Sequence, residues 1–152
     1  MEGKQVRLCV RLNGPIQALD RSRQTAKGIR FDNEKNTANK KKISHLFREA
    51  ALEKGVKLPL EPGNTGYSIS ISVWHGVPQT TTKANLELIR EYKKLPQTKP
   101  DIDNVAKLWL DALTQGGIIK DDKCVTRLSV NKWYDTEPWV SCSLEVMEEF
   151  RT

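Results

Sequence analysis

The chain has 152 residues, of which 29% are charged and 38% hydrophobic, and these values are typical of a globular domain with its own core. No apolar run approaches the roughly 18 residues of a membrane-spanning helix, and the N-terminus lacks the apolar core of a signal peptide. We therefore expect a cytoplasmic protein with one domain, residues 1–152. Its three cysteines, Cys9, Cys124 and Cys142, form no CxxC pair, which argues against a zinc site and a disulfide framework.

The net charge is +6, with a sequence pI near 9.3, and the charge is unevenly distributed. Residues 1–57 carry fourteen Lys and Arg side chains against six Asp and Glu, whereas residues 133–152 carry one Arg against five acids. A positive N-terminal half favours a polyanionic partner, and nucleic acid is the first candidate. A solvated basic surface explains the same pattern, so charge alone leaves both interpretations open.

The first predicted element is a strand at Gln5–Leu12, where apolar and polar side chains alternate. A long polar connection, residues 13–36, follows it, and a connection of this length in a compact domain is usually functional or disordered. Gly28 within it is a candidate hairpin tip. The connection carries four basic side chains that we interpret as contacts to nucleic acid: Arg21, Arg23, Lys27 and Arg30.

The second predicted element is a helix over Thr37–Lys54, capped by Asn36 or Thr37 and ended by Gly55. Its apolar stripe consists of Ile43, Leu46, Phe47, Ala50 and Ala51. The first turn contains three lysines, Lys40–Lys42, at the end of the helix dipole that disfavours cations. Lysines at a position where they lower the stability of the helix indicate a function for these side chains.

The remaining predicted elements complete a small α+β domain. They are a strand at Tyr67–Trp74, a short helix at Ala84–Leu95, a longer helix at Ile102–Thr114, and strands at Val125–Trp133 and Trp139–Met147. Each strand has one apolar face, so we predict a mixed sheet of about four strands with two main helices packed on one face.

The stretch KPDIDNVAKLWLDALTQGGIIKDDKCV, residues 99–125, holds five aspartates in a basic chain. Asp101 and Asp103 stand at the start of the longer helix. Lys107 and Asp111 follow Asp103 at intervals of four residues, on a face away from the apolar stripe. A structural interpretation remains open, with Asp103 as an N-cap and Lys107 and Asp111 as a surface ion pair.

Asp121 and Asp122 weaken this structural interpretation. They follow the helix after a Gly-Gly stop and a short apolar link, and an extended link can bring Asp122 back along the helix toward Asp101 and Asp103. If the extended geometry of the next strand continues back to this pair, Asp122 points toward the helix and Asp121 toward solvent. Asp121 is then a turn former or a supporting residue.

Three carboxylates with few histidines favour hard cations such as Mg²⁺ or Mn²⁺, which activate water and neutralise phosphate charge in phosphodiester cleavage. Lys107, one turn beyond Asp103, is placed to contact the scissile phosphate. An EF-hand loop beginning at Asp101 fits badly, because the required Gly and Glu are Ala106 and Ala112. A phosphatase DxD motif also fits badly, because polar residues rather than an apolar strand precede it.

The same stretch resembles the RusA-type Holliday-junction resolvases, a family of endodeoxyribonucleases. The shared core is D-x-D-N, a lysine four residues past the second aspartate, D-A-L, and an acidic pair before a strand, over residues 98–132. The resemblance implies a homodimeric, Mg²⁺-dependent enzyme that binds four-way DNA junctions and nicks them symmetrically, and such proteins are often encoded by phages or prophages. It implies metal binding by Asp101, Asp103 and Asp122 and a catalytic Lys107, with Asn104 and Asp121 as supporting residues.

Two other functions stay open. A non-catalytic protein that binds junctions or duplexes uses the same basic connection, but it has no need of clustered carboxylates that repel phosphates. A phosphohydrolase of small nucleotides uses the same metal chemistry, and the basic N-terminal half favours a polymer over a nucleotide without excluding the nucleotide.

Overall fold

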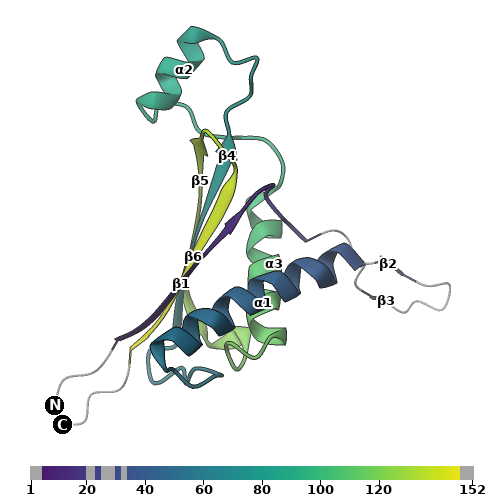
Figure 1. Cartoon of the computed structure of the whole chain (residues 1–152), viewed down its shortest axis with the longest axis vertical. Helices are drawn as coiled ribbons and strands as arrows, with labels where there is room; N and C mark the ends of the chain where they lie inside the picture. The colour runs from purple at the N-terminus through teal and green to yellow at the C-terminus, as the bar shows by residue number, and fades with distance from the viewer. Residues whose placement is uncertain (1–4, 20–22, 25–29, 32–33, 148–152) are drawn as a thin grey trace.

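The fold was obtained as a computed structural model, which describes residues 5–19, 23–24, 30–31 and 34–147 (Figure 1). The strands are β1 (Gln5–Asn13), β2 (Arg23–Gln24), β3 (Arg30–Phe31), β4 (Tyr67–Gly76), β5 (Val125–Asp135) and β6 (Trp139–Met147). The helices are α1 (Glu34–Lys54), α2 (Lys83–Arg90) and α3 (Ile102–Gln115), with a 3₁₀ turn, η1, at Asp122–Cys124. No helix in the described part of the chain is long and apolar enough to cross a membrane.

Four strands form one sheet in the order β1-β6-β4-β5, in which β4 and β5 run parallel and the other neighbours run antiparallel. The predicted mixed sheet of an α+β domain is therefore confirmed. The alternation of β4 gives this strand one buried face, on which Tyr67, Ile69, Ile71 and Val73 are almost fully buried. On the other face Trp74 stacks on the rings of Trp133 and Trp139 (centroids 5.9 and 5.1 Å).

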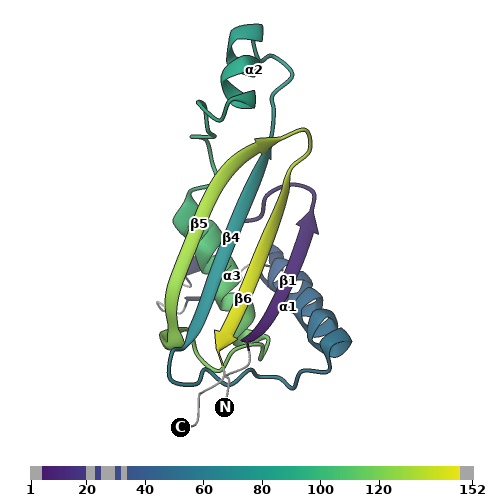
Figure 2. The same cartoon turned by 90° about the vertical axis from the view of Figure 1, so that its left-hand side faces the viewer.

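Helices α1 and α3 cover one face of this sheet, whereas α2 projects beyond its end (Figure 2). The predicted apolar stripe of α3 is completely buried: Val105, Leu108, Trp109, Ala112 and Leu113. Phe47 of α1 meets Trp109 edge to face, with ring centroids 6.4 Å apart. The two helices therefore share one core with the sheet, and α2 contributes no buried residue to it.

Two helix boundaries differ from the predicted ones by three residues or more. α1 begins at Glu34 rather than Thr37, and the side chain of Asn36 is buried in its first turn, which an isolated sequence pattern does not reveal. α2 ends at Arg90 rather than Leu95, because Tyr92 takes a left-handed φ of 58° that the helix cannot continue through.

The predicted hairpin around Gly28 is partly visible. β2 and β3 pair antiparallel, with Arg23 opposite Phe31 and Gln24 opposite Arg30. Gly28 itself lies outside the described residues.

α1 and α3 meet closely at Ser44 and Gly116. The Ser44 hydroxyl lies 2.8 Å from the Lys40 carbonyl oxygen and 3.0 Å from the Ala112 carbonyl oxygen, so two acceptors share its proton. A Cβ atom added at Gly116 would lie 2.3 Å from the Ser44 hydroxyl oxygen and 2.7 Å from the Ala112 carbonyl oxygen. The helix contact therefore depends on the absence of a side chain at this position.

Replacement of Gly116 by alanine tests this contact. We expect Gly116→Ala to lower the free energy of unfolding by about 1–3 kcal/mol, because overpacking forces the two helices apart. Urea denaturation measures the loss. The matched control is Gly76→Ala, since a Cβ atom there meets its nearest neighbour at an ordinary 3.4 Å. Equal stability of the two variants would contradict the close contact.

Candidate functional site

Asp101 and Asp103 lie at the N-terminal end of α3, and both side chains are exposed. Asp101, not Asp103, occupies the N-cap position, so the interpretation of Asp103 as an N-cap is wrong. Asp101 makes no side-chain capping bond, although its position permits one. Asp103 lies in the first turn, where the helix dipole stabilises a carboxylate. Neither carboxylate is used to hold the helix together, so both are available to a ligand.

The two carboxylates line a cavity of about 590 Å³. Its walls come from the segment before α3, from the start of α3 and from β5: Leu95, Pro96, Asp101, Ile102, Asp103, Val130, Asn131, Lys132 and Trp133. Lys132 donates a hydrogen bond to the Thr98 carbonyl oxygen at 2.7 Å, which ties β5 to the segment before α3. The cavity is therefore lined by a lysine and an asparagine of β5 as well as by the two aspartates.

The sequence analysis did not identify Asn131 and Lys132 as site residues. They are ordinary polar residues within a predicted strand, and only the packing of β5 against the start of α3 brings them to the carboxylates. The charge of Lys132 also affects a buried residue of β4, His75. Burial, and then the Lys132 charge, lower the pKa of His75, so this histidine is neutral at pH 7.

Lys107 is exposed one turn beyond Asp103. Within the described part of the chain it makes no hydrogen bond and no ion pair. The predicted pair with Asp111 is absent, because the Asp111 carboxylate lies 3.8 Å from the Lys40 ammonium instead. The Lys107 ammonium is thus available to an anion next to the cavity.

The long connection after β1 is attached beside the same helix end. The Leu19 amide donates to the Asn104 carbonyl oxygen at 3.1 Å, so the backbone of Asn104 anchors the connection. Of the predicted DNA contacts, Arg21 and Lys27 lie outside the described residues. Arg23 and Arg30 belong to β2 and β3, of which the backbone alone is described. The anchor lies two residues before Arg21, so the basic connection leaves from the site.

Asp121 and Asp122 belong to a turn rather than to extended backbone. The Asp121 carboxylate accepts a hydrogen bond from the Lys123 amide at 2.9 Å and caps η1, of which Asp122 is the first residue. This bond, followed by the contact with Asp122, lowers the pKa of Asp121. The expectation that strand geometry extends back to Asp122 is therefore wrong.

Asp122 does not lie at the cavity. It precedes Val125 at the start of β5, whereas the cavity is lined by β5 from Val130 onward. Asn131 lies six positions along the strand from Val125, a distance of about 20 Å at 3.3 Å per residue. Among the residues that the structure describes, no group of three His, Cys, Asp or Glu side chains is suitable for a metal ion.

The link between α3 and η1 explains this separation. The predicted return along the helix does not occur, because the link is held at the far end of the sheet. The Leu60 amide donates to the Ile118 carbonyl oxygen at 3.0 Å, and the Lys120 amide donates to the Tyr67 hydroxyl at 3.1 Å. The chain then returns as β5, so one chain brings Asp101 and Asp103 together but not Asp122.

Comparison with known proteins gives two matches. A family model described as "Endodeoxyribonuclease RusA" matches residues 13–145. The uncharacterized protein YqaN of Bacillus subtilis (strain 168) is 37% identical over 75 residues, which cover 48% of this chain and 52% of YqaN. The chain thus spans about half the length of this curated relative.

A pH titration tests the turn at Asp121. Its pKa is held below the ordinary value of 3.8, so its stabilising bond is present above that value and is lost as the pH falls through the lower folded value. We expect the chemical shift of the Lys123 amide in NMR spectra to change with pH as Asp121 titrates. In Asp121→Ala this pH-dependent change should disappear. Asp122→Asn is the control that leaves the Lys123 bond in place. Titration of the Lys123 amide at 3.8 or above would contradict the cap.

Proposed function

The chain belongs to the RusA endodeoxyribonuclease family, and on this premise we propose that it is a Mg²⁺-dependent, structure-selective endonuclease that resolves four-way DNA junctions by paired nicking. The observation that carries the proposal is the pair Asp101 and Asp103, whose carboxylates line one cavity without capping α3. Lys107, one turn away and without an ion pair among the described residues, supports it. The role would be in DNA recombination and repair in the cytoplasm.

The donors at the cavity fit a divalent cation. Carboxylate oxygens are the ligands that Mg²⁺ prefers, and Asp101 and Asp103 are exposed and without a bonding partner in the described part of the chain. We propose these two residues as metal ligands, with Mn²⁺ as a substitute for Mg²⁺. When bound, such a metal lowers the pKa of a water molecule and neutralises phosphate charge.

The cationic groups around the cavity would position the DNA. Lys107 has no competing partner among the described residues and would bind an oxygen of the scissile phosphate, where negative charge develops. Lys132 is held by Thr98 and would keep a positive charge on the opposite wall. The basic connection anchored at Asn104 would bring Arg21 and Arg23 to the DNA arms beside the site.

A role for Asp122 in the same metal centre requires a second copy of the chain. Within the described residues β5 pairs with β4 alone, so its other edge is free. Antiparallel pairing of two β5 edges about a two-fold axis would bring the Asp122 end of one chain to the Asn131 end of the other. This arrangement supports the proposed homodimer, and its symmetry matches the two strands to be cut in a four-way junction.

A non-catalytic protein that binds DNA junctions is the alternative function. The separation of Asp122 from Asp101 and Asp103 in one chain favours it, because a single chain then offers two carboxylates rather than three. The two functions differ in one measurement, which is cleavage of a labelled four-way junction with and without Mg²⁺.

Substitution of the cavity carboxylates separates binding from chemistry. We expect Asp103→Asn to lower the cleavage rate more than about 100-fold. Loss of a group that only supports a metal ligand typically costs about 10–100-fold, and loss of the ligand itself should cost more. Junction affinity measured without metal should be retained or increased, since a charge that repels phosphate is removed. Asp111→Asn on the same face of α3 is the control and should cleave normally. Full cleavage by Asp103→Asn would contradict the metal site.

Mixing two inactive variants tests the shared metal centre. A heterodimer of Asp103→Asn with Asp122→Asn has one intact site if each site combines Asp103 of one chain with Asp122 of the other. We expect the mixture to recover nicking of one strand, measured on a labelled junction. If both residues act within one chain, every site keeps one substitution and the mixture stays inactive. Recovery should depend on subunit exchange, so covalently linked homodimers of each variant are the control.

A further inference from the structure

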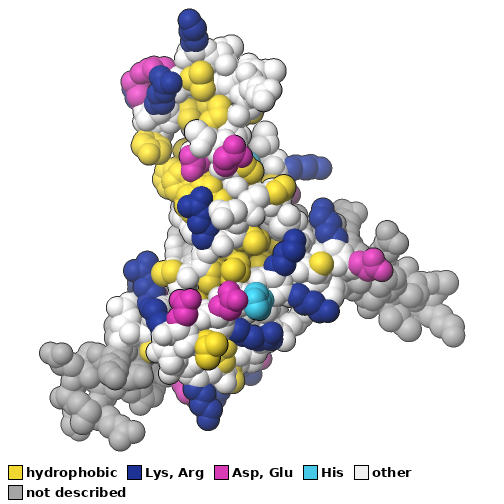
Figure 3. Space-filling model, in the orientation of Figure 1, with side chains coloured by type: hydrophobic (Ala, Val, Ile, Leu, Met, Phe, Trp, Pro, Cys, Tyr) yellow, Lys and Arg dark blue, Asp and Glu magenta, His cyan; other side chains and the backbone are white. Residues whose placement is uncertain are grey.

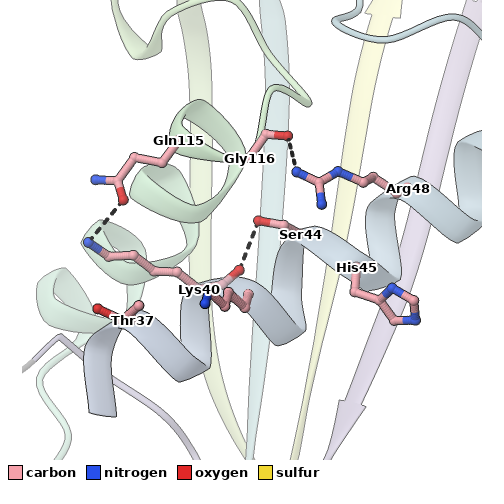
Figure 4. Close-up of a pocket in the computed structure, with 8 residues that line it drawn as sticks. Thr37, Lys40, Ser44, His45, Arg48, Gln115 and Gly116 are labelled. Carbon is pink, nitrogen blue, oxygen red and sulfur yellow. Dashed lines mark hydrogen bonds between the residues drawn. The ribbon is translucent and has the colours of Figure 1, made fainter. Parts of the chain in front are cut away.

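A second cavity, of about 580 Å³, lies between α1 and the C-terminal end of α3 (Figure 4). Eight residues line it: Thr37, Lys40, Lys41, Ser44, His45, Arg48, Gln115 and Gly116. Three of these side chains are cationic at pH 7 and a histidine is the fourth basic group, whereas none of the eight is acidic. The cavity shares no residue with the one at Asp101 and Asp103.

Two of the cations are held in place by α3. Lys40 is only 6% exposed, and its ammonium lies 3.4 Å from the Gln115 amide oxygen, as Figure 4 shows. Arg48 donates one of its five N–H groups to the Gly116 carbonyl oxygen at 2.7 Å. Because both cations are positioned before any ligand arrives, an anion that enters the cavity meets charges that need little reordering.

A structural role explains part of this cluster. Lys40 and Arg48 lie at the C-terminal end of α3, where the helix dipole favours cations. This role does not extend to Lys41, which is exposed on the cavity wall and makes no hydrogen bond or ion pair within the described residues. It also does not account for a cavity that the two helices leave open between them.

The cavity is connected to the proposed active site by one face of α3. Asp103, Lys107, Asp111 and Gln115 follow one another at intervals of four residues and therefore share this face. The twelve residues from Asp103 to Gln115 span about 18 Å of helix, which equals about five base pairs of duplex. Figure 3 shows several Lys and Arg side chains over α1, interspersed with acidic side chains and a histidine.

We propose that the cavity between α1 and α3 binds a phosphate group, and that this group is a backbone phosphodiester of a DNA arm about five base pairs from the cleaved bond. The identity of the ligand as DNA rests on the proposed function. The lining residues supply three cations and no carboxylate; the Asp111 carboxylate of α3 lies 3.8 Å from the Lys40 ammonium and offsets part of its charge, so Lys41 and Arg48 provide most of the charge for phosphate recognition. Because α1 begins at Glu34, Lys40 and Lys41 lie in its second turn, so the predicted basic first turn is wrong, and phosphate binding in the cavity gives these lysines a function.

Two neighbouring lysines provide the test. Lys41 and Lys42 are both exposed on α1, but only Lys41 lines the cavity. We expect Lys41→Gln to weaken binding of a four-way junction several-fold and to reduce the slope of log affinity against log salt by about one. Lys42→Gln should leave both quantities close to those of the unsubstituted protein. Equal effects of the two substitutions, measured without divalent metal, would overturn the proposal.

A second measurement identifies the source of the phosphate. Titration with inorganic phosphate, followed by NMR, should shift the amide resonances of Ser44 and Gly116, and Lys41→Gln should weaken this binding. If the unsubstituted protein binds neither junction nor duplex while phosphate or a nucleoside triphosphate saturates these resonances, the anion site stands and the proposed nuclease function fails. If junction binding is normal while the resonances do not respond to phosphate and Lys41→Gln has no effect, the cavity is not a phosphate site.

Discussion

The parallel pairing of β4 with β5 is the constraint on which the rest of the arrangement depends. Two parallel neighbours require a connection that returns from the end of the first strand to the start of the second, and here α3 makes most of that return. The N-terminal end of α3 therefore lies beside the last residues of β5, and its C-terminal end lies at the start of that strand. The direction of α3 therefore determines at which end of the sheet each of its charged side chains lies.

Burial of the apolar stripe of α3 decides which face of the helix carries its charged side chains to the surface. Leu108 and Trp109 are fully buried against the sheet and α1, so the helix cannot rotate about its axis without exposing them. The face with Asp103 and Lys107 is consequently held toward solvent. Helix α1 crosses at the other end, where Gly116 permits the close approach that forms the basic cavity. One packed helix thus presents carboxylates at one end and meets cations at the other.

The opposite charges at the two ends of α3 suit a polyanion better than a small substrate. Carboxylates alone repel phosphate, and cations alone bind it without cutting it. A separation of about 18 Å lets a duplex contact both ends at once, whereas a nucleotide reaches one. The family to which the chain belongs acts on DNA, and this charge arrangement is consistent with that substrate.

Sequence patterns alone determined the strands, the two main helices and the presence of Asp101 and Asp103 at a helix start, because these features depend on local periodicity and on residues close in the chain. Tertiary structure decided the rest. The tie of Lys120 to Tyr67 holds the link after α3 at the far end of the sheet, so Asp122 is kept from Asp101 and Asp103. The position of Lys132 at the carboxylates and the cavity around Lys40 both depend on contacts between segments distant in sequence. The local periodicity of the sequence does not reveal such contacts.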